Sequence, residues 1–163
     1  MMDAQPQLVC LNETLLDAST EESNLQGYAL IGRRGRPDRA GGGVAVFAHT
    51  DFAEAVNVVA TSAEAERLWC VVHSDLGPIS VGAWYRPPAP GDVDTITSCA
   101  REWQSQGCGA MGTILVGDCN VHSRRWLKHS NGESCEGTAL RTCCQEVGAS
   151  QLVRDPTRGA LSP

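Results

Sequence analysis

Short runs of apolar residues, separated by polar, glycine-rich or proline-containing segments, set the pattern of this chain. They predict strands over residues 8–11, 28–31, 44–49, 52–59, 68–73, 79–85, 113–116 and 151–153. The segment Asp75-Leu76-Gly77-Pro78 has the composition of a turn between two of these strands. Several strands thus follow one another through short links before the first helix, which favours antiparallel pairing over alternating strand and helix units.

Two segments have the spacing of apolar residues that is typical of helices. The first covers residues 92–106, begins at Asp92 as a candidate N-cap and has an apolar face of Val93, Ile96, Ala100 and Trp103. The second covers residues 138–147, and Gly148 follows it as a candidate C-cap. Its apolar stripe consists of Leu140, Cys143, Cys144 and Val147. Adjacent Cys143 and Cys144 point in different directions on a helix, so they cannot both bind one metal ion.

The strand predicted at residues 113–116 is followed by a group of polar residues. Gly117 is expected to end the strand, and Asp118, Asn120 and His122 come directly after it. An Asp and an Asn two residues apart on an extended chain point to the same side. There, one can take a proton from water while the other hydrogen-bonds a phosphate or that same water. The alternative is a strand followed by a turn rich in Asp and Asn, without chemistry.

The strand predicted at residues 8–11 repeats this pattern, because it delivers Asn12 and Glu13 at its end. The strand predicted at residues 79–85 ends in Tyr85-Arg86-Pro87-Pro88, a phenol and a guanidinium before two prolines that stiffen the exit. Both ends are also compatible with ordinary strand exits. Polar side chains at a sheet edge commonly form sites, since the rigid strand fixes groups that a free loop would leave mobile.

The composition limits the class of protein. At 163 residues and 42% hydrophobic content, with charges of both signs, the chain is expected to form one globular domain over residues 1–163. No apolar run approaches the roughly 20 residues of a membrane span, and the first residues lack the layout of a signal peptide. We therefore expect an intracellular protein without membrane contact. The eight cysteines lie mostly in apolar or helix-like runs, which favours reduced thiols.

The distribution of charge along the chain indicates a polyanionic partner, whereas the net charge does not. The net charge is −6, which argues against a protein covered in basic surface. Arginines nevertheless cluster at residues 33–39, and a second basic group, Arg124, Arg125 and Lys128, follows the Asp-Asn-His residues. The planar guanidinium of arginine can bind two phosphate oxygens at once. Such a basic cluster on an otherwise acidic protein can therefore attract a nucleic acid. The alternative for the first cluster is a solvated Arg/Gly loop.

Four short motifs occur in one order along the chain. They are Leu11-Asn12-Glu13-Thr14, Tyr85-Arg86-Pro87-Pro88, Gly117-Asp118-Cys119-Asn120 with His122 and Trp126, and Asp155-Pro156-Thr157-Arg158. In this order and spacing the chain resembles the endonuclease/exonuclease/phosphatase superfamily, and most of all the endonuclease domains of non-LTR retrotransposons. The run Gly41-Gly42-Gly43-Val44-Ala45-Val46 also resembles the glycine-led strand of that group.

The resemblance implies an α+β fold, a two-sheet α/β sandwich of the DNase I-like kind. It also implies hydrolysis of phosphodiester bonds that depends on Mg²⁺ or Mn²⁺. By position, Glu13 would be the metal ligand, and Asp118 would orient or deprotonate the attacking water. Asn120 would hold that water or a phosphate oxygen, and Tyr85 would hydrogen-bond the scissile phosphate.

The resemblance further implies a DNA substrate. Six residues are expected to bind the nucleic acid: Arg86, His122, Arg124, Arg125, Thr157 and Arg158. A reverse transcriptase domain in a longer parent protein would be a partner, and the nucleus would be the location of an enzyme that acts on genomic DNA. The Arg clusters favour a polyanion over a small phosphorylated substrate, because binding of a small phosphate does not need an extended basic surface.

Two departures from the family pattern lead to a further expectation. Only seven residues precede Leu8, and no Ser-Asp-His ending follows residue 158, so the sandwich is expected to be incomplete at both ends. Loss of a group that stabilises transition-state charge typically lowers the rate about 10²- to 10³-fold, so weak activity or none is expected. The alternatives are a non-catalytic retrotransposon-derived remnant or nucleic-acid-binding fragment, and a zinc-stabilised module that uses Cys119, His122, His129 and Cys135.

Overall fold

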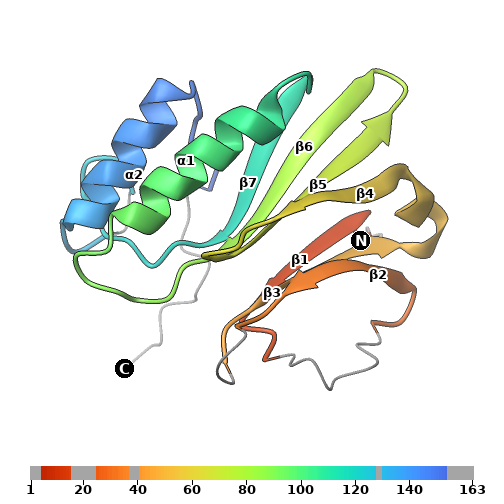
Figure 1. The fold of residues 1–163 in the computed structure, drawn as a ribbon, viewed down its shortest axis with the longest axis horizontal. Coiled ribbons are helices and arrows are strands. Elements are labelled where there is room, and N and C mark those ends of the chain that lie inside the picture. The colour runs from red at the N-terminus through yellow and green to blue at the C-terminus, as the bar shows by residue number, and fades with distance from the viewer. Residues whose placement is uncertain (1–4, 16–24, 37–40, 128–129, 154–163) are drawn as a thin grey trace. The chain divides into compact units, whose positions relative to one another are not determined.

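All strands of the described residues lie in the first of two units into which the chain divides. In the computed structural model this unit is Met1–Pro87 with Ser105–Cys119, and the second unit is Pro88–Gln104 with Asn120–Pro163. The structure describes residues 5–15, 25–36, 41–127 and 130–153, and Figure 1 shows the elements that these ranges form.

The first sheet of this unit has three strands. They are β1 (Leu8–Asn12), β2 (Tyr28–Arg34) and β3 (Val44–His49), in the order β1-β3-β2, and both pairs are antiparallel. The central strand β3 has the apolar sequence VAVFA over its first five residues, and all five are buried. The predicted bounds of β3 are confirmed, whereas β2 is three residues longer than predicted.

The second sheet has four strands in the order β4-β5-β6-β7. They are β4 (Val56–Thr61), β5 (Glu66–Ser74), β6 (Gly77–Tyr85) and β7 (Gly112–Asp118). The first three pair antiparallel as expected, and the turn at Asp75 and Leu76 joins β5 to β6. The pair β6 and β7 is parallel, against the expectation. Parallel neighbours need a long crossover, which here contains the helix α1 (Asp94–Gly107).

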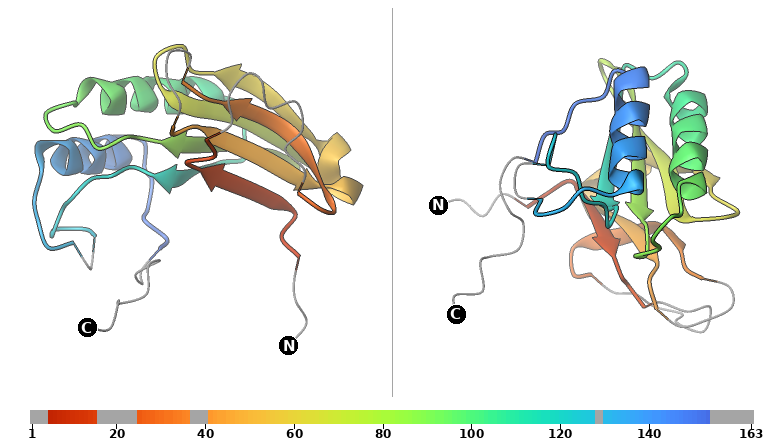
Figure 2. Two further views of the ribbon diagram at one scale, coloured as in Figure 1. Left: turned by 90° about the horizontal axis from the view of Figure 1, so that it is seen from below. Right: turned by 90° about the vertical axis from the view of Figure 1, so that its left-hand side faces the viewer.

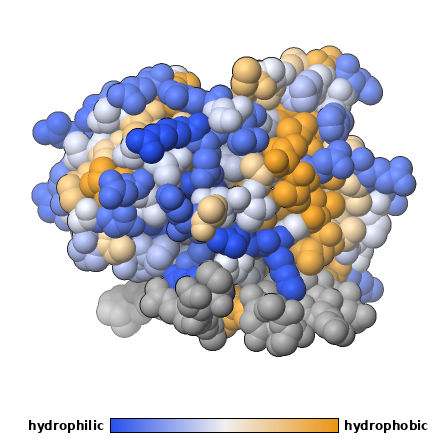
Figure 3. Space-filling model, viewed as in Figure 1, coloured by the Kyte–Doolittle hydropathy of each residue, from blue (hydrophilic) through white to orange (hydrophobic). Residues whose placement is uncertain are grey.

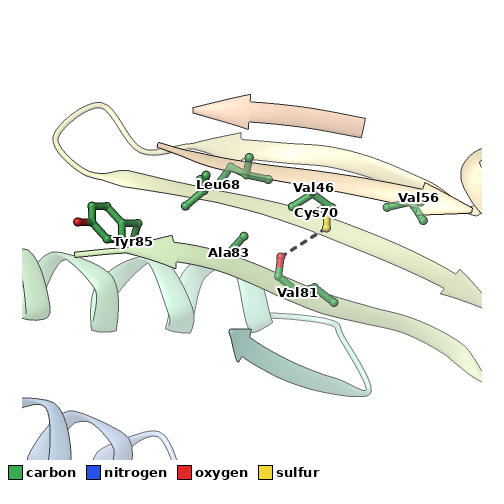
Figure 4. Packing of buried hydrophobic residues seen from close by; sticks show 9 residues of the cluster. Val46, Val56, Leu68, Cys70, Val81, Ala83 and Tyr85 are labelled. Atoms are coloured by element: carbon green, nitrogen blue, oxygen red, sulfur yellow. Dashed lines mark hydrogen bonds between the residues drawn. The ribbon is translucent and has the colours of Figure 1, made fainter. Parts of the chain in front are cut away.

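Apolar side chains from both sheets form one core. Val46 of β3, Leu68 and Cys70 of β5, and Val81 and Ala83 of β6 belong to it (Figure 4), and the thiol of Cys70 donates to the carbonyl of Val81 at 3.6 Å. The two sheets pack face to face as layers of a sandwich (Figure 2). The predicted α+β two-sheet sandwich is therefore confirmed.

The second unit contains the helix α2 (Cys135–Glu146), which runs beside α1 (Figures 1 and 2). Ser134 is the N-cap of α2, and its hydroxyl accepts from the Gly137 amide at 3.0 Å. The side chain of Asp92 accepts from the Thr95 amide at 3.2 Å, so Asp92 caps the start of α1 as predicted. The carboxylate of Glu136 accepts a hydrogen bond from the Gly91 amide and ties the start of α2 to the segment before α1.

One predicted strand begins later than expected, and another is absent. Residues 50–55 form a 3-10 helix, η1 (Thr50–Ala55), and the strand begins only at Val56. The imidazole Nδ1 of His49 accepts from the Asp51 amide at 3.4 Å, and this local bond turns the chain before a strand can start. Residues 151–153 form no strand either, and the side chain of Leu152 is 78% exposed.

Some apolar side chains of the first unit lie on its surface. Val58 and Val59 of β4 and Leu76 in the turn are exposed. Figure 3 shows an apolar patch in the part of the view that β4, β5 and β6 occupy in Figure 1. None of the helices in the described part of the chain is long and apolar enough to cross a membrane.

Candidate active site

Three polar residues are register partners across neighbouring strands at one end of the four-stranded sheet. Tyr85, the last residue of β6, lies opposite Glu66, the first residue of β5, and beside Asp118, the last residue of β7. Partners in register place their side chains on the same face of a sheet. Since Tyr85 belongs to the core between the sheets, this face is the one that the first sheet covers. A phenol between two carboxylates therefore lines the end of the sandwich.

Gly117 allows β7 to carry Asp118 to this position. The strand does not end at Gly117, as the sequence predicted, but continues through it to Asp118. Gly117 has a φ of 144°, and a Cβ at this residue would lie 1.7 Å from the carbonyl oxygen of Trp84. Only glycine fits such a close approach of two backbones, so the residue preserves the pairing of β7 with β6 instead of breaking it.

Glu13 reaches the same end from the other sheet. It follows β1 directly, and β1 approaches both β6 and β7 across the sandwich. The hydroxyl of Tyr85 donates a hydrogen bond of 2.5 Å to Oε1 of Glu13. The structure therefore brings together two residues that are 72 positions apart in sequence and that the motifs predicted separately.

The backbone around Glu13 is held in an uncommon conformation. Glu13 and Leu15 have φ values of 53° and 55°, which residues other than glycine rarely adopt. Pairing of Asn12 with Val44 fixes the chain before Glu13, and a 3.1 Å bond from the Leu15 amide to the Gly42 carbonyl fixes it afterwards. Backbone strain of this kind often accompanies functional sites, because the surrounding structure has to enforce it.

The environment of Tyr85 stabilises its neutral form. The hydrogen bond to Glu13, followed by burial and by the negative charges of Glu13 and Glu66, raises the pKa of the Tyr85 phenol from its usual 10 to about 12. The positive charge of Arg36 acts in the opposite direction. Tyr85 is therefore a hydrogen-bond donor at neutral pH and does not act as a base.

We expect this pKa to respond to Glu13. In a Tyr28→Phe background Tyr85 is the only tyrosine, so the near-ultraviolet absorbance of phenolate reports its titration alone. Glu13→Gln should lower the pKa of Tyr85 from about 12 towards 10, because it removes the charged acceptor that favours the protonated phenol. An unchanged titration in the folded variant would mean that the pair does not form in solution. EDTA keeps metal ions out of the measurement.

Glu66 is a member of this region that the sequence analysis missed. Its carboxylate is buried and accepts hydrogen bonds from the guanidinium Nε of Arg36 and from the Gly43 amide. One signal was present, since a carboxylate at the head of the apolar run 68–72 is unusual in a buried strand. Its partners are 23 and 30 residues away, and no local pattern reveals such a pairing.

Arg86 supports the end of β7. Its amide donates to the Asp118 carbonyl at 2.9 Å, and its Nη1 lies 3.5 Å from the Cys119 carbonyl. The residue is only 1% exposed, so its guanidinium is directed into the protein. This burial favours a role in positioning Asp118 over the direct contact with nucleic acid that was expected from the sequence.

The remaining described site residues belong to the second unit. Asn120 has a φ of 45°, so the extended backbone that the sequence analysis assumed between Asp118 and Asn120 ends before Asn120. The backbone of His122 is bound to Ser134, while its side chain is exposed. Nε and Nη2 of Arg124 donate to the Asn131 carbonyl at 3.1 and 2.5 Å.

Arg125 is exposed in the same loop, and the Arg124 amide donates to Glu133 at 3.0 Å. The Ser123 hydroxyl, followed by the Arg124 amide, holds the pKa of the Glu133 carboxyl below its usual value. These contacts fix the loop that carries the basic residues. The predicted contributors Thr157 and Arg158, like Lys128 and His129, lie outside the described residues.

Two residues with oxygen ligands of the kind that Mg²⁺ prefers, Asn12 and Glu13, follow one another at the end of β1. Within the described residues, the buried Oδ1 of Asn12 has no hydrogen-bond partner, and the Glu13 carboxylate is next to it in sequence. Mg²⁺ uses one or two carboxylates and completes its shell with water and substrate phosphate. Among the described residues no three His, Cys, Asp or Glu side chains form a metal-binding group, so nothing there matches the zinc alternative.

Comparison with solved structures finds the same fold in a nuclease. The chain is similar to the endonuclease domain of TRAS1, a telomere-specific non-LTR retrotransposon, with a TM-score of 0.58 and 16% sequence identity. The match covers 76% of this chain and 54% of that domain, so the chain spans about half of the domain's length. The likeness shows a shared fold and agrees with the resemblance that the motifs indicated.

Sequence comparisons add no closer relative. No family model matches the chain. No curated protein matches it either.

Proposed function

We propose that this chain carries the metal-dependent phosphodiesterase site of a DNA endonuclease. The observation that supports this most is the hydrogen bond of 2.5 Å between Tyr85 and Glu13, with Asp118 next to Tyr85 in the register of β6 and β7. Two carboxylates and a neutral phenol at one end of a sandwich suit the hydrolysis of a phosphate ester. The fold shared with a retrotransposon endonuclease domain supports the same reaction.

Glu13 and Asn12 would hold the Mg²⁺ or Mn²⁺ ion. Both offer hard oxygen atoms, and the buried Oδ1 of Asn12, which has no hydrogen-bond partner among the described residues, is an acceptor that a bound cation would satisfy. A bound divalent ion supplies positive charge that polarises the phosphate and lowers the pKa of coordinated water. Before substrate binds, the Tyr85 hydroxyl donates to Oε1 of Glu13 and orients the carboxylate.

The other residues act on water and phosphate. Asp118 orients the attacking water and accepts its proton, and Arg86 holds the backbone of Asp118 through a 2.9 Å bond. Tyr85 has a single hydroxyl hydrogen, so on substrate binding it would leave Glu13 and donate to a phosphate oxygen instead. Its pKa of about 12 keeps the phenol protonated for this role. Asn120 holds the water or a phosphate oxygen through its amide.

The nucleic acid would contact the basic loop of the second unit. His122, Arg124 and Arg125 lie in this loop, and contacts to Asn131 and Glu133 order it. Ordered arginines bind phosphate at a smaller loss of side-chain entropy than mobile ones. Thr157 and Arg158 belong to the proposal by the sequence motif alone. A reverse transcriptase domain in a longer parent protein and a nuclear location complete it.

A second candidate is a nucleic-acid-binding protein without catalysis. The observation that favours it is the length of the match, since the chain corresponds to 54% of the endonuclease domain. Groups from the rest of such a domain that stabilise transition-state charge would then be missing, and removal of one such group typically lowers a rate about 10²- to 10³-fold.

Nicking of supercoiled plasmid distinguishes the two candidates. We expect the 163-residue protein to convert supercoiled into open-circular plasmid with Mg²⁺ and not with EDTA, at the low rate expected from the sequence. Mn²⁺ should replace Mg²⁺, and Ca²⁺ should support binding without nicking, because their oxygen ligands are similar and their Lewis acidity differs. Plasmid binding without nicking in both Mg²⁺ and Mn²⁺ would refute the endonuclease and leave the binding protein.

A further inference from the structure

We infer that Arg36 is a phosphate-binding residue of this site, held in place by Glu66 next to Tyr85. The inference rests on the proposed function, because it assigns a further substrate contact to the same end of the sandwich. The ligand is a phosphate group of the nucleic-acid backbone.

Glu66 provides a fixed anchor. Its side chain is 8% exposed, and its two oxygens have different partners, Nε of Arg36 on Oε1 and the Gly43 amide on Oε2. A buried carboxylate needs such partners to remain charged. The glycine loop packs directly against this pair, since a Cβ at Gly42 would lie 2.1 Å from Oε2 of Glu66 and 3.0 Å from Cζ of Arg36.

The guanidinium of Arg36 retains donors beyond this anchor. Among the described residues, only its Nε donates a hydrogen bond, and the side chain is 18% exposed. A guanidinium carries five N–H donors in a rigid fork, and the terminal nitrogens match two oxygens of one phosphate. Anchored at Nε, the group offers these nitrogens at little further loss of side-chain freedom.

The position of the pair connects it with the site. Glu66 is the register partner of Tyr85, so their side chains share one face. Arg36 bonds to Glu66, so its guanidinium lies at the same end of the sheet as Tyr85, and its positive charge lowers the pKa of the phenol. On the other side, a Cβ at Gly43 would lie 3.0 Å from Oγ1 of Thr14, the residue after Glu13. Arg36 thus places a cation at the end of the sandwich where Glu13, Glu66 and Asp118 lie.

The competing interpretation is that Arg36 only neutralises Glu66. The two interpretations differ once both charges are removed together. If Arg36 only neutralises Glu66, the double variant Arg36→Gln/Glu66→Gln should bind DNA as the parent does, because the charge that Arg36 neutralises is also removed. If Arg36 binds phosphate, the double variant still lacks that contact. The double variant also avoids an uncompensated buried charge, so it should fold where a single variant does not.

The test measures binding of a labelled DNA duplex in EDTA over a series of KCl concentrations. The proteins are the parent, Arg36→Gln, the double variant and Arg101→Gln, which removes an equal charge from an exposed position on α1. Thermal unfolding confirms that each is folded. We expect both proteins without Arg36 to bind about tenfold more weakly. Their plot of log affinity against log salt should lose about one unit of slope. Arg101→Gln should match the parent.

Parent-like affinity and slope in the double variant would overturn the inference, and so would the absence of any DNA binding by the parent. This result is independent of the nicking assay. If Arg36→Gln shows the expected tenfold loss of DNA affinity but the parent does not nick plasmid, the endonuclease is refuted and the phosphate contact is kept. Metal-dependent nicking with an unchanged salt slope in the Arg36 variants would do the reverse.

Discussion

Asp118→Asn is expected to lower the rate of metal-dependent plasmid nicking by about 10³-fold, in the middle of the range for loss of a general base. The amide has the size of the carboxylate but cannot accept a proton from water at neutral pH. The backbone of Asp118 should stay in place, because its bond from the Arg86 amide and its pairing with Tyr85 involve main-chain atoms only. The loss should therefore appear in the rate and not in DNA binding.

Asp75→Asn is the matched control for this experiment. Asp75 lies exposed in the turn between β5 and β6, so the change removes the same charge from the same unit. Its nicking rate should equal that of the parent, and both variants should bind the duplex in EDTA as the parent does. Nicking by Asp118→Asn at the parent's rate would show that another group activates the water, or that a contaminating nuclease is present. Purification of all three proteins in parallel separates these two outcomes.

Gly117→Ala is expected to destabilise the fold by at least about 4 kcal/mol, a size that point substitutions reach only when they break a defined structural feature. An added Cβ would lie 1.7 Å from the Trp84 carbonyl oxygen and 2.7 Å from its carbon, and neither atom can move without disrupting the pairing of β6 and β7. The φ of 144° adds backbone strain for alanine. Urea unfolding, followed by the fluorescence of buried Trp69 and Trp84, measures the change in free energy.

Gly112→Ala, at the other end of the same strand, is the matched control. Apart from its chain neighbours, no described residue has a heavy atom within 4 Å of a Cβ at Gly112, so its urea midpoint should stay close to that of the parent. Similar midpoints for the two variants would mean that β7 does not approach β6 as closely at Gly117 as the structure shows. A loss of Asp118 function in Gly117→Ala at low temperature, without unfolding, would instead place the disturbance at the strand end.

The strands were predictable where the local pattern and the tertiary environment agree. The buried run of β3 and the hairpin of β5 and β6 combine apolar residues with clear turn residues, and both were predicted correctly. Where the two disagree, the prediction failed. The apolar residues Phe52 and Ala53 pack against the core from a short 3-10 helix, so their apolar character was real but their conformation was not that of a strand.

Gly117 was expected to end β7, but it allows the strand to continue. In sequence, Gly117 indicates a strand break, whereas in the sheet it allows a close approach to Trp84 that only tertiary structure reveals. The parallel pairing of β6 and β7 was not predictable for the same reason, because the sequence of a crossover does not show which strand the chain pairs with afterwards. The exposed apolar residues Leu152 and Val153 show that an apolar triplet is too short to define a strand.

The site was predictable as far as its residues stand at strand ends. Glu13, Tyr85 and Asp118 each follow or end an apolar run, and the structure places Glu13 in contact with Tyr85 and Asp118 beside it in register. Glu66 and Arg36 were missed because their pairing spans 30 residues and leaves no periodic signal. The burial of Arg86 was not predicted for a related reason, since the sequence does not show that a charged residue next to two prolines is buried.

The left-handed backbone of Glu13 puts two selection pressures in conflict at one position. A non-glycine residue in this conformation typically costs about 1 to 3 kcal/mol, so glycine or asparagine at residue 13 would relieve strain that glutamate carries. Directed evolution for thermal tolerance or expression alone would therefore enrich substitutions that delete the carboxylate. A library screened for both robustness and cleavage would have to retain Glu13 and gain its stability elsewhere, at positions remote from the end of the sandwich.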